Sequence, residues 1–456
     1  MPIHSIAYGI ALLIPLAGCS ANIDAGTSPK PGATDAAPPP PSTAPFDAGS
    51  EATVDGSVQI DADNGAPSTT YPAPHPSPPL ASSGGGAVLS KPKIVPVFFP
   101  NDPYVAAIQD LTSKIGTSDY WNAVVHEYGV GPATSAPPVI LTETPPAQLT
   151  DADIGQWLMA KLDGTHPEFG PPDSQTIYTI YYPSTTTINM TGSPSAGGSD
   201  AGAAPDGGAP VDAGGGGLGT SCVDFGGYHM ALTVRGTPMA YAVIPECPTF
   251  GGLLGVDVAT GASSHEWVEA VTDPFMDGYV ADDLAYADLL QGALELGDLC
   301  VVDSSPFFTP SDLGHVVQRT WSNATASAGH NPCAPSPLKS AYFNAAPAKL
   351  DDVTAQMNGF SARGRGISLK PNATNTIDIA LFSDRDTGGP WTVDARELSK
   401  SSSLNLALDR TSGVNGEKLH LTVSFRVPPP SGYATFVLVS RLGNDQHVWP
   451  VIVVSP

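Results

Sequence analysis

SSHEWVEAVTDPF, residues 263–275, is a helix-like stretch among strand-like runs, and this mixture decides the expected fold class. Ser263 or Ser264 is placed to cap the start of a helix, because a serine hydroxyl can accept a backbone N–H there. Pro274 stops the helix, since proline lacks the N–H that a helix interior needs. The apolar run 241–244 just upstream predicts a strand. A helix that follows a strand in this way indicates a domain that mixes both elements.

The chain before residue 263 also contains both helix and strand patterns. Strand-like runs of apolar, β-branched and aromatic residues lie at 93–99, 139–142 and 176–182. Helical patterns lie at 104–115, 119–128 and 150–162. We therefore expect an α+β domain over residues 87–340, interrupted at 192–219 by a disordered insertion almost without large apolar side chains.

The last part of the chain, residues 341–456, has a different pattern. Its apolar residues alternate with period two, and turn residues separate the runs at 377–381, 404–408, 419–425, 434–442 and 448–454. No helical period intervenes. This pattern predicts an all-β sandwich of immunoglobulin-like size, with accessory binding or spacing as its expected role.

The net charge excludes one class of partner. The chain has 19 Lys and Arg against 44 Asp and Glu, for a formal charge of −25. Such a field repels the phosphate backbone of nucleic acids and anionic lipid headgroups. We therefore expect no nucleic-acid partner.

Residues 1–19 have the features of a bacterial lipoprotein signal peptide. The apolar run at 6–16 is too short to span a bilayer, and it leads into LAGC, which resembles a lipobox with Cys19 as the lipid-modified residue. No Lys or Arg precedes the run, and an ordinary cleaved signal with a chance cysteine is the alternative. Residues 20–86, rich in Pro, Ala and Asp, would form a disordered tether. We expect an exported monomer, anchored to the outer membrane or cell surface through the lipid alone.

Four further cysteines follow, at Cys222, Cys247, Cys300 and Cys333. An even number in an exported chain predicts two disulfides, for which three connectivities are open. We favour Cys222–Cys247 and Cys300–Cys333, because each closes a local loop. A cysteine metal site is the rival interpretation, and no CxxC spacing supports it.

The motif that could carry chemistry is HExxE at 265–269. Residues four apart share a helix face, so His265 and Glu269 project together and can bind one cation. Glu266, next to the first ligand, is placed to act as a general base on a water molecule. The ordinary alternative is a solvent-facing helix that contains two glutamates without any function, since the pattern is short.

A third ligand is needed, and ELGDLC at 295–300 offers two acids. Glu295 and Asp298 rank nearly equal as the ligand, and the other acid would orient the site. Cys300 would pin this segment through its disulfide.

Other residues are candidates for supporting roles. His229 could be a further ligand or an electrophile, and His229 or Tyr279 would steady a developing oxyanion. His315 and His330 are weaker candidate ligands.

The donor types also bear on the identity of the metal. One histidine with two carboxylates would cancel the charge of Zn²⁺ and weaken its power to acidify water. Zn²⁺ is the first expectation, while Mn²⁺ or Ca²⁺ would compete at such a site. A metal that stabilises the fold without catalysis is the alternative.

Three stretches together, SHEWVEAVTDPF, ELGDLC and QRTWSNATASAGHNPC, resemble a family of exported bacterial proteins regarded as zincin-like metallopeptidases, many of them lipoproteins. The matching positions are Ser264, His265, Glu266, Glu269, Thr272, Asp273, Pro274, Glu295, Asp298, Cys300, Trp321, Ser322, Asn323 and Cys333. The resemblance covers about residues 90–340. It implies a zincin-like α+β core with a metal site at the HExxE helix.

A second, more distant resemblance argues against a metal site. AVTDPFMDGY, residues 270–279, is similar to a stretch of the plant EXORDIUM or phosphate-induced proteins. Those proteins are extracellular, growth-related and generally without the HE pair, which implies that such a scaffold can persist without a metal site.

Two functions are therefore expected as alternatives. The leading one is a surface-tethered metal-dependent hydrolase acting on a peptide or protein substrate. The other is a non-catalytic cell-surface protein that binds wall glycan or matrix and keeps a structural or vestigial metal site. The sequence contains no GxSxG elbow and no GxxxxGK[ST] loop, which argues against a serine hydrolase and against nucleotide chemistry.

Overall fold

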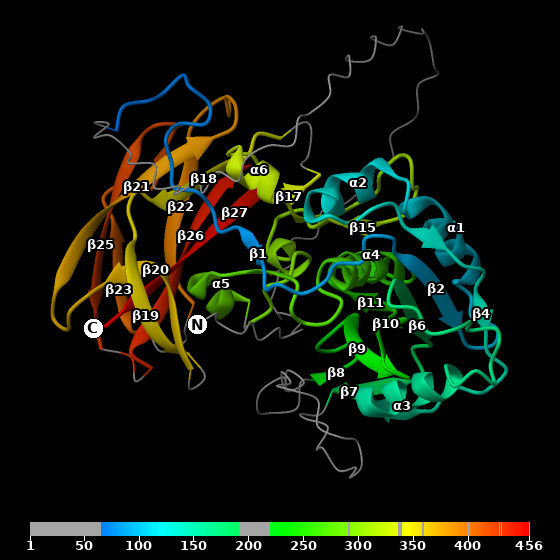
Figure 1. Cartoon of the computed structure of the whole chain (residues 1–456). Helices are drawn as coiled ribbons and strands as arrows, with labels where there is room; N and C mark the ends of the chain where they lie inside the picture. Colours follow the sequence, from blue (N-terminus) through cyan, green and yellow to red (C-terminus); the bar gives the residue numbers. More distant parts are fainter. Residues whose placement is uncertain are drawn as a thin grey trace, which may run out of the picture.

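The computed structural model describes residues 65–190, 219–290, 292–335, 340–357, 360–398, 402–427, 429 and 431–455. This part of the chain is mostly β-sheet with few helices. Figure 1 shows helices α1 to α4 with the strands around them on one side, and the strands β18 to β27 on the other. The signal peptide, Cys19 and residues 192–218 of the predicted insertion lie outside the described residues.

A six-stranded mixed sheet forms the centre of the first body. Its strands are β2 (Lys93–Phe98), β3 (Thr134–Ser135), β4 (Val139–Ile140), β6 (Thr176–Tyr182), β9 (Tyr228–Val234) and β10 (Thr237–Pro245). The order is β3-β2-β6-β10-β9, with β4 also on β2. Strands β2, β6 and β10 run parallel, while β9 pairs antiparallel with β10 and forms the edge.

Helices cover both faces of this sheet. On one face lie α1 (Val105–Ile115), α2 (Asp119–Val125), the short η1 (His126–Tyr128) and α4 (Val256–Thr272), and on the other lies α3 (Asp151–Lys161). Alternate strand residues separate the two cores. Ile177 packs with the α2 and α4 side chains, whereas the next residue, Tyr178, packs with those of α3. Because helices cover both faces of the sheet, side chains on both sides of its strands are buried, and the strand sequences are continuous apolar runs.

Helix α4 places the HExxE motif, and it begins earlier than the serines suggest. Its N-cap is Gly255, with a φ of 54°, so the prediction that Ser263 or Ser264 caps the helix is wrong. Both serines are fully buried inside the helix: Ser263 shares a 2.9 Å hydrogen bond with the Tyr181 hydroxyl, and Ser264 donates to the Gly261 carbonyl. The serines lie in the interior of the helix because residues 256–262 precede them as almost two further helical turns. The helix ends at Thr272, just before Pro274, as predicted.

Residues 65–86 are predicted to belong to the disordered tether, and the structure instead packs them on both bodies. Strand β1 (Ala81–Ser83) pairs with β13 (Tyr279–Ala281). His75 stacks on Phe382 at a centroid distance of 3.9 Å, and Asn415 bonds the backbone of the same segment. The segment has few apolar side chains of its own, so its order comes from backbone pairing and borrowed contacts, which composition does not report.

Short elements complete the first body. They are β5 (Gln148–Thr150), β7 (Thr187–Met190), β8 (Gly219–Thr220), β11 (Thr249–Phe250), β12 (Leu253–Leu254), α5 (Leu284–Leu289), η2 (Asp298–Cys300), β14 (Phe307–Phe308), β15 (Val317–Gln318), β16 (Thr320–Trp321), α6 (Asn323–Ser327) and β17 (Cys333–Ala334). The disulfides are Cys222–Cys247 and Cys300–Cys333, which confirms the sequential pairing. None of the described helices is both long and apolar enough to cross a membrane.

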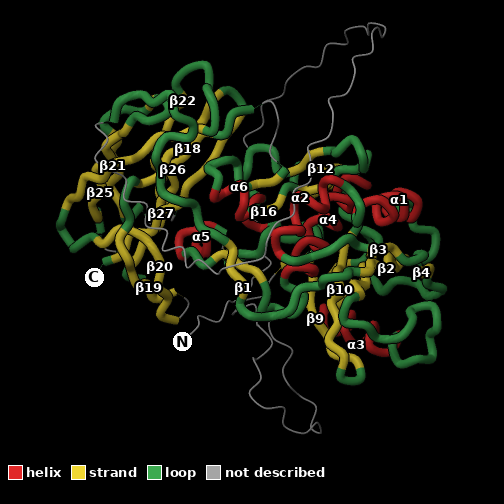
Figure 2. Tube along the Cα trace, turned by 45° about the horizontal axis from the view of Figure 1, so that its top comes forward, coloured by secondary structure: helices red, strands yellow, loops and turns green. Residues whose placement is uncertain are grey.

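The second body is a sandwich of two sheets. One has the order β18-β21-β25-β23 and the other β19-β20-β27-β26-β22-β24. Their bounds are β18 (Phe343–Pro347), β19 (Asp351–Met357), β20 (Phe360–Ser368), β21 (Thr374–Ser383), β22 (Trp391–Glu397), β23 (Leu404–Leu408), β24 (Ser412–Gly413), β25 (Lys418–Phe425), β26 (Tyr433–Leu442) and β27 (Asp445–Val454). The five predicted runs are strands in the structure, while β18, β19, β20, β22 and β24 were not predicted. Figure 2 shows α5 as the helix nearest the sandwich, where Leu284 packs with Ile452.

Candidate metal centre

Three separate elements bring acids and histidines to one place beside α4. Helix α4 contributes three of them, the edge strand β9 contributes one, and the turn that enters η2 contributes two. We call this the His–carboxylate cluster, and its members are His229, His265, Glu266, Glu269, Glu295 and Asp298. The four carboxylate residues and His229 are only 3–8 % exposed, so the predicted solvent-facing alternative for this helix does not hold.

His265 faces carboxylates through one ring nitrogen and an amide through the other. Its Nε2 lies 3.1 Å from Glu269 Oε1 and 3.7 Å from Asp298 Oδ1. Its Nδ1 lies 3.0 Å from Gln318 Oε1, while Gln318 Nε2 donates to the Gly297 carbonyl at 2.7 Å. Because the Gln318 amide is oriented by Gly297, its oxygen accepts from Nδ1–H, and the ring turns Nε2 toward the carboxylates.

His229 has the same arrangement on the other side of Glu269. Its Nε2 lies 3.2 Å from the Asp273 backbone carbonyl and 3.4 Å from Glu295 Oε1. Its Nδ1 lies 3.6 Å from both Glu266 Oε2 and Glu269 Oε2. Within the described residues, each nitrogen of the two histidines therefore has oxygen acceptors as its polar neighbours, so a proton or a cation must lie between them.

The electrostatics of the cluster follow from burial and close opposite charges. Burial acts to lower the pKa of His229 and of His265, but the surrounding carboxylates outweigh it and raise both pKa values well above the ordinary range. Burial raises the pKa of Glu295 and of Asp298 well above the usual carboxyl range. Burial also acts to raise the pKa of Glu269, but the two imidazoles outweigh it and lower that pKa to about 2. Without a cation the rings hold protons, which a bound metal would displace.

The donor set fits a divalent cation. Ligand atoms of His229, Glu269 and Glu295 lie within 4.8 Å of one another, and so do those of His265, Glu266 and Glu269. Imidazole nitrogens and carboxylate oxygens are ligands of Zn²⁺ and Mn²⁺. In addition, Glu295 Oε1 is buried and receives no hydrogen bond from the described residues. A buried carboxylate oxygen without a donor is costly unless a cation satisfies it.

Two glycines keep the cluster open. A Cβ on Gly297 would lie 2.7 Å from Glu269 Oε1 and 2.7 Å from His265 Nδ1. A Cβ on Gly227 would lie 2.8 Å from Glu266 Oε1. Since these distances are shorter than van der Waals contact, any larger residue at either position would displace the donor atoms.

The two acids predicted as alternative third ligands have different neighbours. Asp298 contacts His265, whereas Glu295 contacts His229 and joins the compact group on that side. The third donor in the compact group around His265 is Glu266, the residue predicted as the base. Cys300 follows Asp298 within η2 and anchors it through the disulfide to Cys333, as expected.

Three predicted candidates have contacts elsewhere. The Tyr279 ring meets the Tyr128 ring at 4.9 Å, and no described contact joins it to the cluster. His315 pairs with Asp110 at 2.8 Å, and His330 lies 3.2 Å from Asp384 at the sandwich. Each lies on a segment whose strand pairing or loop path leads its side chain away, which motif spacing does not reveal.

Gln318, on β15, is the residue that sequence reasoning missed. It orients His265 across 53 residues of chain, and its backbone N–H also donates to Ser264 Oγ at 2.9 Å. The segment HVVQRTW contains no spacing that would identify Gln318 as a partner of a histidine. The Gly-Gly pair before Tyr228 is a sequence signal for a close approach of the backbone to other groups.

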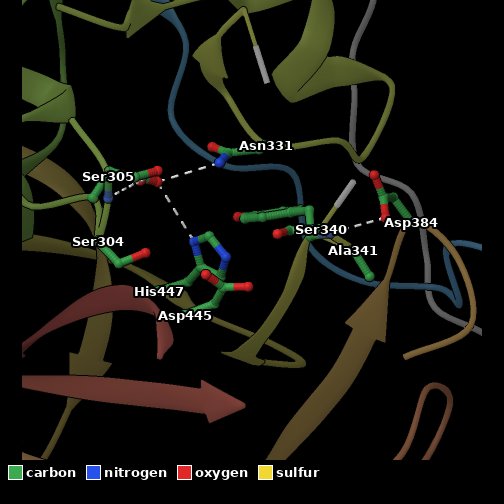
Figure 3. Close-up of a pocket in the computed structure, with 10 residues that line it drawn as sticks. Ser304, Ser305, Asn331, Ser340, Ala341, Asp384, Asp445 and His447 are labelled. Atoms are coloured by element: carbon green, nitrogen blue, oxygen red, sulfur yellow. Dashed lines mark hydrogen bonds and ion pairs between the residues drawn. The ribbon is translucent and has the colours of Figure 1, made fainter. Parts of the chain in front are cut away.

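A separate polar pocket lies at the junction of the two bodies (Figure 3). His447 Nδ1 lies there 3.6 Å from Asp303 Oδ2, and Asn331 donates to the same oxygen at 3.2 Å. The pocket measures about 20 Å³, which is room for roughly one water molecule. Burial lowers the pKa of His447. A pocket of this volume holds no molecule much larger than water.

Comparisons with known proteins do not identify a family for this chain. No protein-family model and no curated protein matches this chain. Among solved structures, a chimeric titin Z1Z2 carrying an exogenous decorin peptide is 8 % identical, covering 20 % of this chain and 85 % of its own, with a TM-score of 0.15. A titin M10–obscurin-like 1 Ig complex is 15 % identical, covering 20 % and 85 %, with a TM-score of 0.15. Domains 4 and 5 of the S-layer protein SbsC are 12 % identical, covering 33 % and 89 %, with a TM-score of 0.16. These likenesses are too partial to carry an argument about function.

Proposed function

We propose that this protein is a metal-dependent hydrolase, with a peptide or protein as its substrate. The observation that carries the proposal is the pair of histidines whose nitrogens face oxygen acceptors within a buried set of four carboxylates. A site of this kind satisfies a cation and is costly without one.

His265 and Glu269 would hold the metal, together with Asp298 or Glu295. Zn²⁺ is the first choice, and the oxygen-rich donors also suit Mn²⁺ or Ca²⁺. When bound, the cation would supply Lewis acidity, lowering the pKa of a water molecule and polarising a carbonyl. Gln318 keeps the His265 ring in the ligating tautomer.

Glu266 would act as the general base. Its carboxylate belongs to the compact group with His265 and Glu269, so it is within reach of a water molecule beside a cation there. Burial raises the pKa of Glu266, which brings a carboxylate closer to the range in which it can accept and return a proton near neutral pH. His229, in contact with Glu266, would either steady developing negative charge on the substrate or act as a further metal ligand.

The motif pattern supports a place for the protein in the exported zincin-like metallopeptidase family. SHEWVEAVTDPF and ELGDLC supply every residue of the cluster except His229. With its lipobox at Cys19, the protein would be anchored to the outer membrane or cell surface by lipid, and it would act there as a monomer.

The test combines one conservative variant with metal analysis. Glu266→Gln should abolish cleavage of a mixed peptide library while the purified protein keeps its metal, and chelation should stop cleavage by the unchanged protein. Asp257→Asn, at an exposed position on the same helix, is the matched control and should stay active. Full activity of Glu266→Gln would contradict the proposed mechanism.

A second candidate function is a non-catalytic binding protein of the cell surface with a structural or vestigial metal site. The burial of the cluster favours it, since even the most open member, His265, has a side chain only 14 % exposed. Such a protein would bind wall glycan or matrix and cleave nothing. Purified protein with less than about a tenth of an equivalent of metal, or with metal and no cleavage, supports this candidate.

A further inference from the structure

We propose that the His–carboxylate cluster binds two divalent cations, bridged by the carboxylate of Glu269. Its Oε1 lies 3.1 Å from His265 Nε2, and its Oε2 lies 3.6 Å from His229 Nδ1. Each oxygen of this one side chain thus faces a different imidazole. Carboxylates that bridge two ions about 3.5–4 Å apart present their oxygens in this way. The inference rests on the metal-binding part of the proposed function and not on hydrolysis.

The donor atoms divide into two sets that share only Glu269. One set is His229, Glu269 and Glu295, and the other is His265, Glu266 and Glu269. Within each set the ligand atoms lie within 4.8 Å of one another, so three candidate ligands surround one point. Each set has one imidazole and two carboxylates, so each alone resembles a complete ligand set for one ion. Around His265, Asp298 Oδ1 lies 3.7 Å from Nε2 and can take the place of Glu266 as a ligand, which leaves Glu266 to act as the base.

The outer nitrogen of each histidine is held by a separate oxygen. Gln318 accepts from His265, and the Asp273 carbonyl accepts from His229. Because the two rings are oriented independently, both turn their other nitrogen toward Glu269. Metal-binding histidines usually have such an acceptor behind them. A site for one ion at His265 would leave the same arrangement at His229 without a purpose.

Buried charge also favours two ions over one. The cluster contains four buried carboxylates, Glu266, Glu269, Glu295 and Asp298, and its two imidazoles are neutral once they act as ligands. One divalent cation balances two ionised carboxylates and leaves the other two to hold protons, whereas two cations allow all four carboxylates to be ionised. An ionised carboxylate that is buried without a compensating cation is costly.

Glu295 supplies an independent sign of the second ion. Its Oε1 is buried and receives no hydrogen bond from the described part of the chain, although it lies 3.4 Å from His229 Nε2. That ring nitrogen is already placed to donate to Asp273. An ion in the set around His265 would not satisfy this oxygen, while an ion in the set around His229 would.

The number of bound ions tests the inference without reference to activity. The full chain is stripped with chelator, reloaded separately with Zn²⁺ and with Mn²⁺, desalted and analysed by elemental mass spectrometry. We expect about two equivalents per chain with at least one of the ions. The Mn²⁺-loaded protein should also give an exchange-coupled electron paramagnetic resonance spectrum in place of the spectrum of isolated Mn²⁺.

Variants identify which carboxylates hold the ions. Glu295→Gln should lower the metal content to about one equivalent per chain and abolish the exchange coupling. Glu269→Gln should weaken the binding of both ions. Asp257→Asn, exposed on the same helix, should keep about two. Circular dichroism reports whether each variant is folded. If Glu295→Gln does not fold, the number of metal ions bound by the unchanged protein tests the two-ion site by itself.

The outcomes separate this inference from the proposed function. A folded protein that takes up at most about one equivalent of either ion overturns the two-ion site and leaves the metal-dependent hydrolase standing. A protein that takes up neither ion overturns both.

Discussion

The side-chain oxygen of Gln318 lies 3.0 Å from Nδ1 of His265, and this contact aims the opposite ring nitrogen at Glu269. A glutamine on a two-residue strand thus selects the tautomer of a histidine on the central helix. The Gln318 amide is itself held by the Gly297 carbonyl, so its oxygen and nitrogen are distinguishable.

Replacing Gln318 by methionine should weaken metal binding. The side chain keeps its length but loses the acceptor that holds His265, so affinity should fall by about 10–100-fold. Competition against a fluorescent chelator measures this change. Gln356→Met, at an exposed position on β19, is the control and should bind normally. Unchanged affinity in Gln318→Met would show that the ring is oriented by something else.

Gly297→Ala should disturb the cluster through contact alone. The backbone at Gly297 is helical, with φ −70° and ψ −45°, so alanine brings no strain there. Its Cβ, however, would lie 2.7 Å from donor atoms of His265 and Glu269. We expect a loss of about 1–3 kcal/mol in the free energy of unfolding, together with lower metal content. Gly389→Ala, where the added Cβ meets nothing within 4 Å, should change neither quantity.

Removing the Cys300–Cys333 disulfide should lower both the free energy of unfolding and the affinity for metal. The bond ties η2, and with it Asp298, to β17. The double Cys→Ala variant should lose about 2–5 kcal/mol in denaturant unfolding, and its metal affinity should fall. Removing Cys222–Cys247 should cost a similar free energy with a smaller effect on metal, because neither cysteine lies next to an acid of the cluster in sequence. Equal effects on metal would contradict a specific role for Cys300.

Glu246 predicts a pH dependence that is separate from the metal centre. Burial, with Asp102 beside it, raises the pKa of Glu246 to about 9. The folded protein therefore retains this proton where the unfolded chain releases it. The stability contribution is complete below the unfolded pKa of 4.5 and is lost as pH rises through about 9.

Denaturant unfolding at several pH values checks this sign. The free energy of unfolding should fall between about pH 5 and about pH 9 in the unchanged protein and less steeply in Glu246→Gln. Asp257→Asn should keep the full slope, since that carboxylate is exposed. A Glu246→Gln profile parallel to that of the unchanged protein would rule out Glu246 as the source.

Asn415 should control the order of the segment at residues 65–80. Its side chain accepts from Ala73 N and donates to the carbonyls of Ser68 and Thr70. Asn415→Leu removes these bonds and should make the segment cleavable in limited proteolysis, followed by mass spectrometry. Asn405→Leu, on the exposed face of β23, should leave the cleavage rate unchanged.

Local patterns predicted much of the secondary structure. The strand at 176–182, the end of α4 at Thr272 and the helix predicted at 150–162, which is α3, all follow from residues within a few positions of one another. The predicted start of α4 was wrong because the serines at 263 and 264 would be good helix caps in isolation. In the fold, tertiary contacts bury them and extend the helix back to Val256.

The candidate site was predicted in part for the same reason. His265, Glu266 and Glu269 lie on one helix, so helical periodicity alone brings them together. Tyr279, His315 and His330 looked equally suitable by residue type, yet their described contacts lie elsewhere.

The sequence by itself indicated many of the helices and longer strands, the favoured pairing of the cysteines and the three donors on α4, because these depend on short-range propensity and spacing. Only the tertiary structure decided that His229 from the edge strand β9 and Gln318 from β15 meet that helix. Strand pairing and burial bring together residues that are far apart along the chain, and no local pattern specifies such contacts. The second imidazole facing Glu269, and with it the inference of a second ion, comes from that long-range assembly.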